Sequence, residues 1–259
     1  MDPPQRGGRG SKAMGIWDEL MRQPGFSPLQ AVFGAVMYVA WTAAYATIIY
    51  RGFKDRTYGV PWPCIVLNVA WEAIFSFELT DAKLHWFFLY GNRFWLVFDV
   101  FILYQLARYG REAQVVPWLK RWFYPLFALS AVAAFGAIYT FTLYFHDLKG
   151  VASSMSMNLV MSIAFPVFHL SRPGREGLST SAAWLKMVGT LAGSVFLATW
   201  WPAQFVDGHL RTHPSVDEPT TYGFMYFLYG AIFVFDCIYI GLCLRDDRER
   251  ALTVNPRAS

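Results

Sequence analysis

The pentapeptide NVAWE, residues 68–72, lies inside an apolar run over residues 60–79. The run is long enough to cross a bilayer, and an ionisable side chain near its middle, Glu72, costs roughly 3 kcal/mol on membrane-insertion scales. Helical spacing places Asn68, Glu72 and Ser76 on one face. The carboxyl group either joins neighbouring helices by hydrogen bonding or is a reactive acid in a cavity between helices. The rest of the chain favours the reactive acid.

The composition is that of a membrane protein. Hydrophobic residues make up 55% of the 259 and charged residues 15%, against about 25% charged in soluble domains. The apolar residues fall into seven segments of about membrane-spanning length: residues 29–50, 60–79, 86–107, 122–145, 151–170, 182–201 and 222–244. The sequence therefore predicts an all-α, polytopic bundle of seven transmembrane helices over residues 28–245. A polar tail, residues 1–27, with a possible interfacial helix precedes it, and a charged tail, residues 246–259, follows it.

The charges indicate an orientation. Seven Lys and Arg residues fall on the N-terminal side of the predicted membrane and thirteen on the other, which predicts an outer N-terminus and a cytoplasmic C-terminus. The expected location is a bacterial cytoplasmic membrane or, in a fungus, the endoplasmic reticulum. The net charge of +4 includes no basic run interleaved with aromatics, which excludes a nucleic-acid surface. The sequence leaves the oligomeric state open.

Three carboxyl groups lie at membrane depth in the predicted spans: Glu72, Asp99 and Asp236. No lysine or arginine is expected in mid-span to neutralise them. An unpaired carboxyl group in apolar surroundings favours its neutral form, so at least one of the three should carry a proton at neutral pH. A neutral carboxylic acid beside an ionised one provides an acid and a base in one cavity.

Two further polar faces accompany these acids. Tyr229, Phe233 and Tyr239 share a helix face with Asp236, and their rings could orient the acid or stabilise a passing cation. Asn158 forms a second polar stripe with serines four residues before and after it. Such stripes either line a site or only join helices by hydrogen bonds.

Other patterns exclude alternatives. No His or Cys cluster has metal-ligand spacing, so no metal site is expected. The five histidines lie near span ends or in loops, where solvated histidines are ordinary. The acidic run DDRE, residues 246–249, is expected to be a solvated terminus rather than a diphosphate–magnesium motif. The last span has no lysine in its middle, which argues against a retinal-binding protein.

Four motifs carry a family resemblance. FKDRTYG (residues 53–59), followed nine residues later by NVAWE, resembles the membrane-integral terpene cyclases of fungal meroterpenoid and paxilline-type indole-diterpene pathways, whose bacterial relatives act on prenylated indoles. WPAQF (residues 201–205) and FDCIY (residues 235–239) are also similar to segments of that family. The resemblance covers about residues 29–245.

The resemblance implies an enzyme that protonates a terminal epoxide or alkene of a lipophilic prenylated substrate within the bilayer. A carbocation then passes through successive ring closures and is quenched by proton loss, with no metal or other cofactor. The family's two acids correspond to Glu72 and Asp236, and which of them donates the proton is left open. Asp99 has no secure counterpart and is a third catalytic candidate. The expected substrate-binding residues are Asn68, Trp71, Ser76, Asn158, Tyr229, Phe233 and Tyr239.

Two other classes compete with this interpretation. Intramembrane carboxylates also mark the proton pathways of transporters and channels. A non-catalytic membrane scaffold would use the same groups for helix packing alone. The paired FKDRTYG and NVAWE motifs favour the enzyme over both.

Overall fold

The computed structural model describes residues 27–80, 84, 86–145, 147, 149–200, 205–206, 209–210 and 223–254. Its helices are α2 (Pro28–Lys54), α3 (Trp62–Ser76), α4 (Trp86–Tyr109), α5 (Pro117–Arg121), α6 (Phe123–Tyr144), α7 (Val151–Leu170), α8 (Thr180–Trp200) and α9 (Gly223–Val254). Two short strands, β1 (Phe205–Val206) and β2 (His209–Leu210), form an antiparallel pair. The possible interfacial helix in residues 1–27 and most of the WPAQF motif lie outside the described residues.

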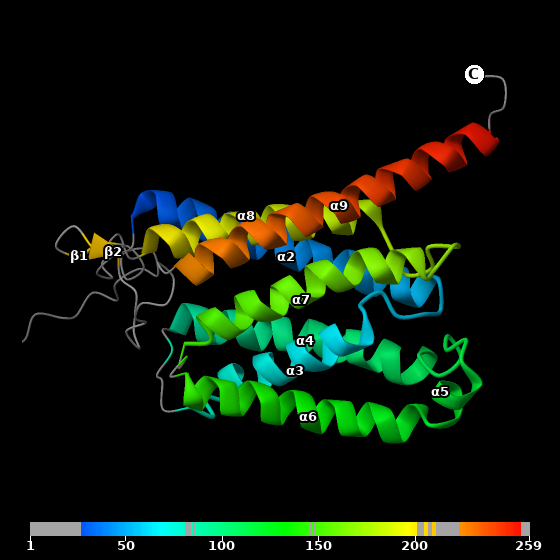
Figure 1. Cartoon of the computed structure of the whole chain (residues 1–259), viewed down its shortest axis with the longest axis horizontal. Coiled ribbons are helices and arrows are strands. Elements are labelled where there is room, and N and C mark those ends of the chain that lie inside the picture. The colour runs from blue at the N-terminus through cyan, green and yellow to red at the C-terminus, as the bar shows by residue number, and fades with distance from the viewer. Residues whose placement is uncertain are drawn as a thin grey trace, which may run out of the picture.

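The long helices run up and down along one axis (Figure 1). Helix α2 packs most extensively on α8, α3 on α4 and α6, and α9 on α7 and α8. In the view of Figure 1, helices α3, α4 and α7 lie between α2, α8 and α9 on one side and α6 on the other.

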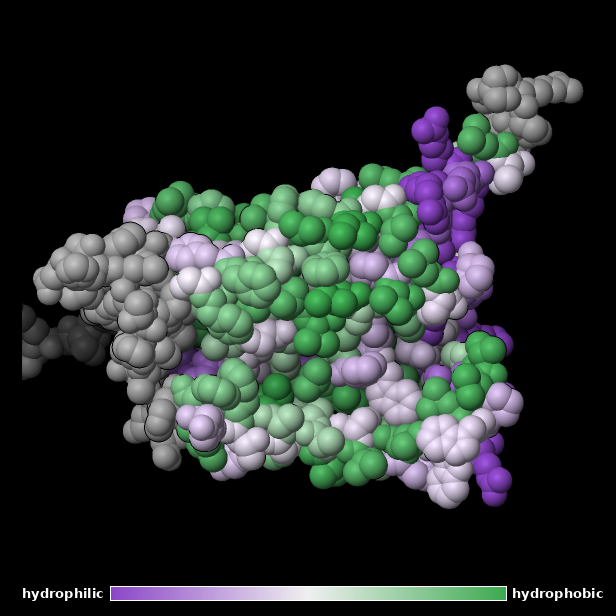
Figure 2. All heavy atoms as spheres, viewed as in Figure 1, coloured by the Kyte–Doolittle hydropathy of each residue, from purple (hydrophilic) through white to green (hydrophobic). Residues whose placement is uncertain are grey.

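Among the described helices, five are long and apolar enough to cross a membrane: α2, α6, α7, α8 and α9. The predicted count of seven spans is thus not confirmed. Helix α3 has only 15 residues, since Pro61 precedes it and Glu78, just after it, adopts left-handed backbone with φ 49°. Glu72 consequently lies in the last turn of α3, not near the middle of a span. Figure 2 shows a broad apolar surface across the bundle, bounded at one end by hydrophilic side chains near the C-terminal part of α9.

The FKDRTYG loop is fixed at that hydrophilic end of the bundle. Gly177, in the loop between α7 and α8, has φ 77°, and its N–H donates to the Asp55 carboxylate at 2.9 Å. A Cβ at Gly177 would lie 2.8 Å from the Thr57 methyl group and 2.9 Å from the carbonyl oxygen of Tyr58. Arg172 donates to that same carbonyl at 2.7 Å. The motif therefore joins two loops that are far apart in sequence.

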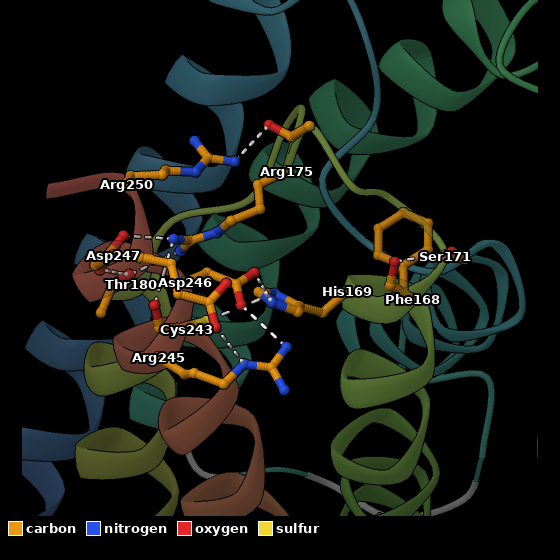
Figure 3. Close-up of polar contacts among 12 residues, drawn as sticks. Phe168, His169, Ser171, Arg175, Thr180, Cys243, Arg245, Asp246, Asp247 and Arg250 are labelled. Atoms are coloured by element: carbon orange, nitrogen blue, oxygen red, sulfur yellow. Dashed lines mark hydrogen bonds and ion pairs between the residues drawn. The ribbon is translucent and has the colours of Figure 1, made fainter. Parts of the chain in front are cut away.

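The acidic run at residues 246–249 is only in part a solvated terminus: residues 247–249 are exposed, but both aspartates contact other elements. Helix α9 continues through it, and Asp246 contacts the buried His169 at 2.8 Å (Figure 3). Asp247 pairs with Arg175 and accepts the hydroxyl of Thr180 at 2.6 Å. These contacts fasten α9 to the end of α7 and the start of α8. The expectation of a solvated histidine at position 169 is likewise wrong, because α9 covers it.

Candidate active site

A cavity of about 480 Å³ lies between α2, α3, α4, α7 and α8. Its volume falls within the range of about 300–1,000 Å³ that is common for small-molecule pockets. Leu84, Lys149 and Gly150 also line it, which places it toward the end of the bundle opposite the FKDRTYG loop (Figure 1). The cavity is large enough for an extended apolar substrate.

Glu72 lines this cavity from the last turn of α3. The residue is 3% exposed, and its Oε2 atom has no hydrogen-bond partner among the described residues. Glu72 supplies the only carboxyl group among the described residues that line the cavity. A buried polar atom without a partner is costly, so this carboxyl group is available to a bound molecule.

Asn68, one turn before Glu72, connects α3 to two neighbouring helices. Its side-chain amide donates to the Tyr45 hydroxyl at 2.6 Å and to Asp99 Oδ2 at 2.8 Å. Asp99 is fully buried on α4, and its Oδ1 atom has no partner among the described residues. The two buried carboxyl groups thus differ: Asp99 receives a hydrogen bond from Asn68, whereas the Oε2 atom of Glu72 receives none from the described residues.

Aromatic rings form much of the cavity wall. The Trp71 indole N–H donates to the carbonyl oxygen of Gly150 at 3.1 Å and to Ser153 Oγ at 3.0 Å. Tyr38 and Trp95 stack with 4.5 Å between ring centroids. Because these rings are held in place, their faces can stabilise a cation without rearrangement. Further apolar side chains complete the wall: Met37, Trp41, Leu84, Phe88, Val151, Met155, Met157, Met161, Phe196 and Leu197.

The start of α7, which carries part of this wall, is held by Asp147. Its carboxylate accepts the backbone N–H groups of Ala152 at 3.1 Å and Ser153 at 2.7 Å. Burial raises the pKa of Asp147 above its usual value, although hydrogen bonds to the carboxylate oppose that shift. This cap fixes Gly150 and Ser153, the two acceptors of the Trp71 indole.

Two amide side chains add polar groups to the cavity. Asn158 of α7 donates to Thr190 of α8 at 3.2 Å, and its Oδ1 atom is buried without a partner among the described residues. Asn92 of α4, 5% exposed, also lines the cavity. These groups can bind an oxygen-bearing part of a substrate.

Asp236 is separated from Glu72. Lys186 of α8 donates to Asp236 Oδ1 at 2.6 Å and to Ser162 Oγ at 2.7 Å, and both charged side chains are almost fully buried. The expectation that no lysine neutralises the acids is therefore wrong for Asp236. Tyr229 and Phe233 line a cavity of about 10 Å³ with Asp236, apart from the large one.

The remaining predicted residues lie in different places. Asn68, Trp71 and Asn158 line the large cavity, as does Glu72. Tyr239 lines a second small cavity together with Asp99. Ser76 is fully buried and does not line any of these three cavities.

Several wall residues escaped the sequence analysis, although their spacing was a signal. Tyr38, Trp41 and Tyr45 recur at helical intervals on α2, and Asn92 precedes Asp99 by two turns on α4. Lys186 likewise begins a polar stripe on α8 with Thr190 and Ser194, four and eight residues later. No group of three His, Cys, Asp or Glu side chains in the described part of the chain is placed to hold a metal ion.

Comparisons with known proteins agree on one family. The family model for Pyr4-like transmembrane terpene cyclases matches residues 21–245. Terpene cyclase macJ of Penicillium terrestre is 26% identical over 188 residues, which cover 67% of this chain and 69% of the relative. Terpene cyclase cle7 of Aspergillus versicolor is 26% identical over 200 residues, 72% of this chain and 80% of the relative. Terpene cyclase pyr4 of Aspergillus fumigatus is 26% identical over 197 residues, 73% and 77% respectively. No solved structure matches the chain.

Proposed function

The chain belongs to the family of Pyr4-like transmembrane terpene cyclases, and we propose that its large cavity cyclises a prenylated substrate by proton transfer from Glu72. The observation that carries this proposal is the buried Glu72 carboxyl group, which lines the cavity with Oε2 unpartnered among the described residues. The family match favours the cyclase over the transporter and the scaffold.

The proposed reaction is an isomerisation in which Glu72 acts as a general acid. The Glu72 O–H bond breaks as its proton adds either to a carbon of the terminal alkene or to the oxygen of a terminal epoxide, whose C–O bond then breaks to leave a hydroxyl group and a cationic carbon. Each ring closure then uses the electron pair of a C=C bond and moves the positive charge along the prenyl chain. Loss of a proton from a carbon beside the last cation restores the Glu72 carboxyl group. Substrate and product therefore have the same mass.

Asp99 is the proposed partner that keeps Glu72 protonated. The hydrogen bond from Asn68 stabilises an ionised Asp99, and the Oε2 atom of Glu72 receives no equivalent bond from the described residues. Two neighbouring carboxyl groups cannot both ionise easily in a low-dielectric interior, so the proton resides on Glu72. Of the two partners expected from the sequence, Asp99 is supported by its link to Glu72 through Asn68, whereas Asp236 is engaged by Lys186.

The aromatic wall completes the proposed mechanism. A carbocation in water would be captured early, and an apolar cavity slows that side reaction by excluding water. The faces of Trp71, Trp95 and Tyr38 supply negative electrostatic potential where the charge develops. The amides of Asn92 and Asn158 would bind the group to which the prenyl chain is attached.

The proposed membrane arrangement keeps seven spans, with α3 and α4 enclosed by neighbouring helices where their polar residues form the site. Figure 3 shows Arg175, Arg245 and Arg250 around the C-terminal part of α9, which supports a cytoplasmic C-terminus and an outer N-terminus. The fungal relatives support the endoplasmic reticulum as the location.

The test compares membranes that contain the wild type, Glu72→Gln or Glu112→Gln at equal expression. Glu112→Gln is the matched control, because it makes the same chemical change in the exposed loop between α4 and α5. Each membrane receives farnesyl- and geranylgeranyl-substituted aromatics with and without a terminal epoxide. We expect a product of unchanged mass from the wild type and the control but not from Glu72→Gln. Equal product from Glu72→Gln would refute the donor role.

A further inference from the structure

A second, much smaller cavity lies behind the acid pair. Its volume is about 20 Å³, and its mainly apolar lining includes the polar side chains of Asp99, Tyr45, Lys186 and Tyr239. A cavity of about 10–15 Å³ is sufficient for one water molecule when two or more polar groups face it. This cavity therefore has the size and the lining of a single-water site.

Two polar groups that line this cavity have unused hydrogen-bonding capacity. Asp99 Oδ1 is buried and has no partner among the described residues. Lys186 has three N–H donors, of which two go to Ser162 and Asp236. One water molecule could accept the third N–H of Lys186 and donate to Asp99 Oδ1.

We propose that this cavity binds one water molecule joining Lys186 to Asp99, and that Lys186 is a positioning residue that holds Asp99 ionised. Asp236 and Ser162 hold the ammonium group in place, so Asp236 acts on the reaction through Lys186. The proposal rests on the proposed function, in which an ionised Asp99 keeps the proton on Glu72.

The arrangement predicts how binding and turnover respond to changes in Lys186. Lys186 does not line the large cavity, so its loss leaves the binding of substrate largely intact. The loss of its charge frees Asp99 to take up a proton and weakens the preference of the shared proton for Glu72. Turnover therefore falls while KM changes little.

The experiment uses variants of the full chain in membranes. Lys186→Met alone leaves Asp236 buried without its partner and endangers folding, so the test variant is the double change Lys186→Met with Asp236→Asn. The matched control neutralises the exposed pair by Lys120→Met with Glu112→Gln. We expect kcat of the Lys186/Asp236 double variant to fall at least about tenfold with KM within about twofold of the wild type. Lys186→Arg, which keeps the charge, should recover most of the turnover.

If the Lys186–Asp236 ion pair were purely structural, the Lys186/Asp236 double variant would fold and keep the wild-type kcat. That result would overturn the inference. If that variant does not fold, infrared difference spectra of the wild type against Asp99→Asn decide the question. We expect the signal of an ionised Asp99, and the signal of a protonated Asp99 would overturn the inference. Activity in Glu72→Gln would instead refute the proposed function, so the two failures are distinguishable.

Discussion

Asn68 donates its side-chain amide to Asp99 at 2.8 Å and so ties α3 to α4 beside the large cavity. This bond gives the two neighbouring carboxyl groups different surroundings, since Glu72 Oε2 receives no hydrogen bond from the described residues. In the proposed mechanism, the Asn68 amide therefore helps to distinguish the acid, Glu72, from its base, Asp99.

Replacing Asn68 by alanine tests this arrangement. Asn68→Ala removes the hydrogen bond that the side-chain amide donates to Asp99 Oδ2 and should cost about 1–3 kcal/mol of stability. We expect turnover to fall about tenfold or more, because Asp99 then competes with Glu72 for the proton. Product formation and thermal unfolding in detergent measure both effects. Wild-type turnover in Asn68→Ala would contradict the proposed role of the amide.

Two substitutions of Trp71 distinguish the contribution of its aromatic ring from that of its indole N–H group. Trp71→Phe keeps an aromatic face but loses the bonds to Gly150 and Ser153, whereas Trp71→Leu loses both. A cation–ring interaction is worth about 1–2 kcal/mol in a dry site, so Trp71→Leu should be roughly tenfold slower than Trp71→Phe. Trp71→Leu should also release more incompletely cyclised product, measured by mass spectrometry with chromatography. Equal rates for the two variants would argue for plain packing.

A substitution of Gly177 tests the contact between its loop and the FKDRTYG loop, at the end of the bundle opposite the large cavity. A methyl group there would collide with Thr57 and Tyr58 on backbone with φ 77°. We expect Gly177→Ala to lower the free energy of unfolding by roughly 1–3 kcal/mol. Gly136→Ala is the control, since a Cβ at Gly136 meets no atom within 4 Å and alanine favours the helix. The measurement is the unfolding temperature in detergent, which should fall for Gly177→Ala only.

A substitution of Arg175 tests the contacts that join α9 to the start of α8. The guanidinium group is 5% exposed, pairs with Asp247 and donates to Thr180 at 2.8 Å. Arg175→Met should destabilise the protein by about 1–3 kcal/mol, since its polar partners lose a donor. The product pattern should not change, because the large cavity lies toward the other end of the bundle. Arg248→Met, at an exposed position on α9, should have little effect on either measurement. A changed product pattern in Arg175→Met would show that this end influences the site.

The sequence alone predicted most of the helical segments and the helix face that carries Asn68 and Glu72, but not the position of Glu72 near the end of the short helix α3. Helix α7 matches the predicted span, Val151–Leu170, because long apolar runs form helices in lipid to satisfy their backbone groups. The four-residue interval between Asn68 and Glu72 also put both on one face, and both line the large cavity. These features follow from local periodicity, which the order of residues carries directly.

Only the tertiary structure decided which acid accompanies Glu72. Asp99 and Asp236 are equivalent in the sequence as carboxyl groups in apolar helices, but Asn68 reaches the first and Lys186 holds the second. Lys186 and Asp236 lie 50 residues apart on different helices. Their pairing depends on how α8 and α9 pack and on which faces they turn toward each other. A buried charge is stable only where this packing brings an oppositely charged side chain into contact with it. Helical periodicity describes one helix at a time and carries no information about that meeting.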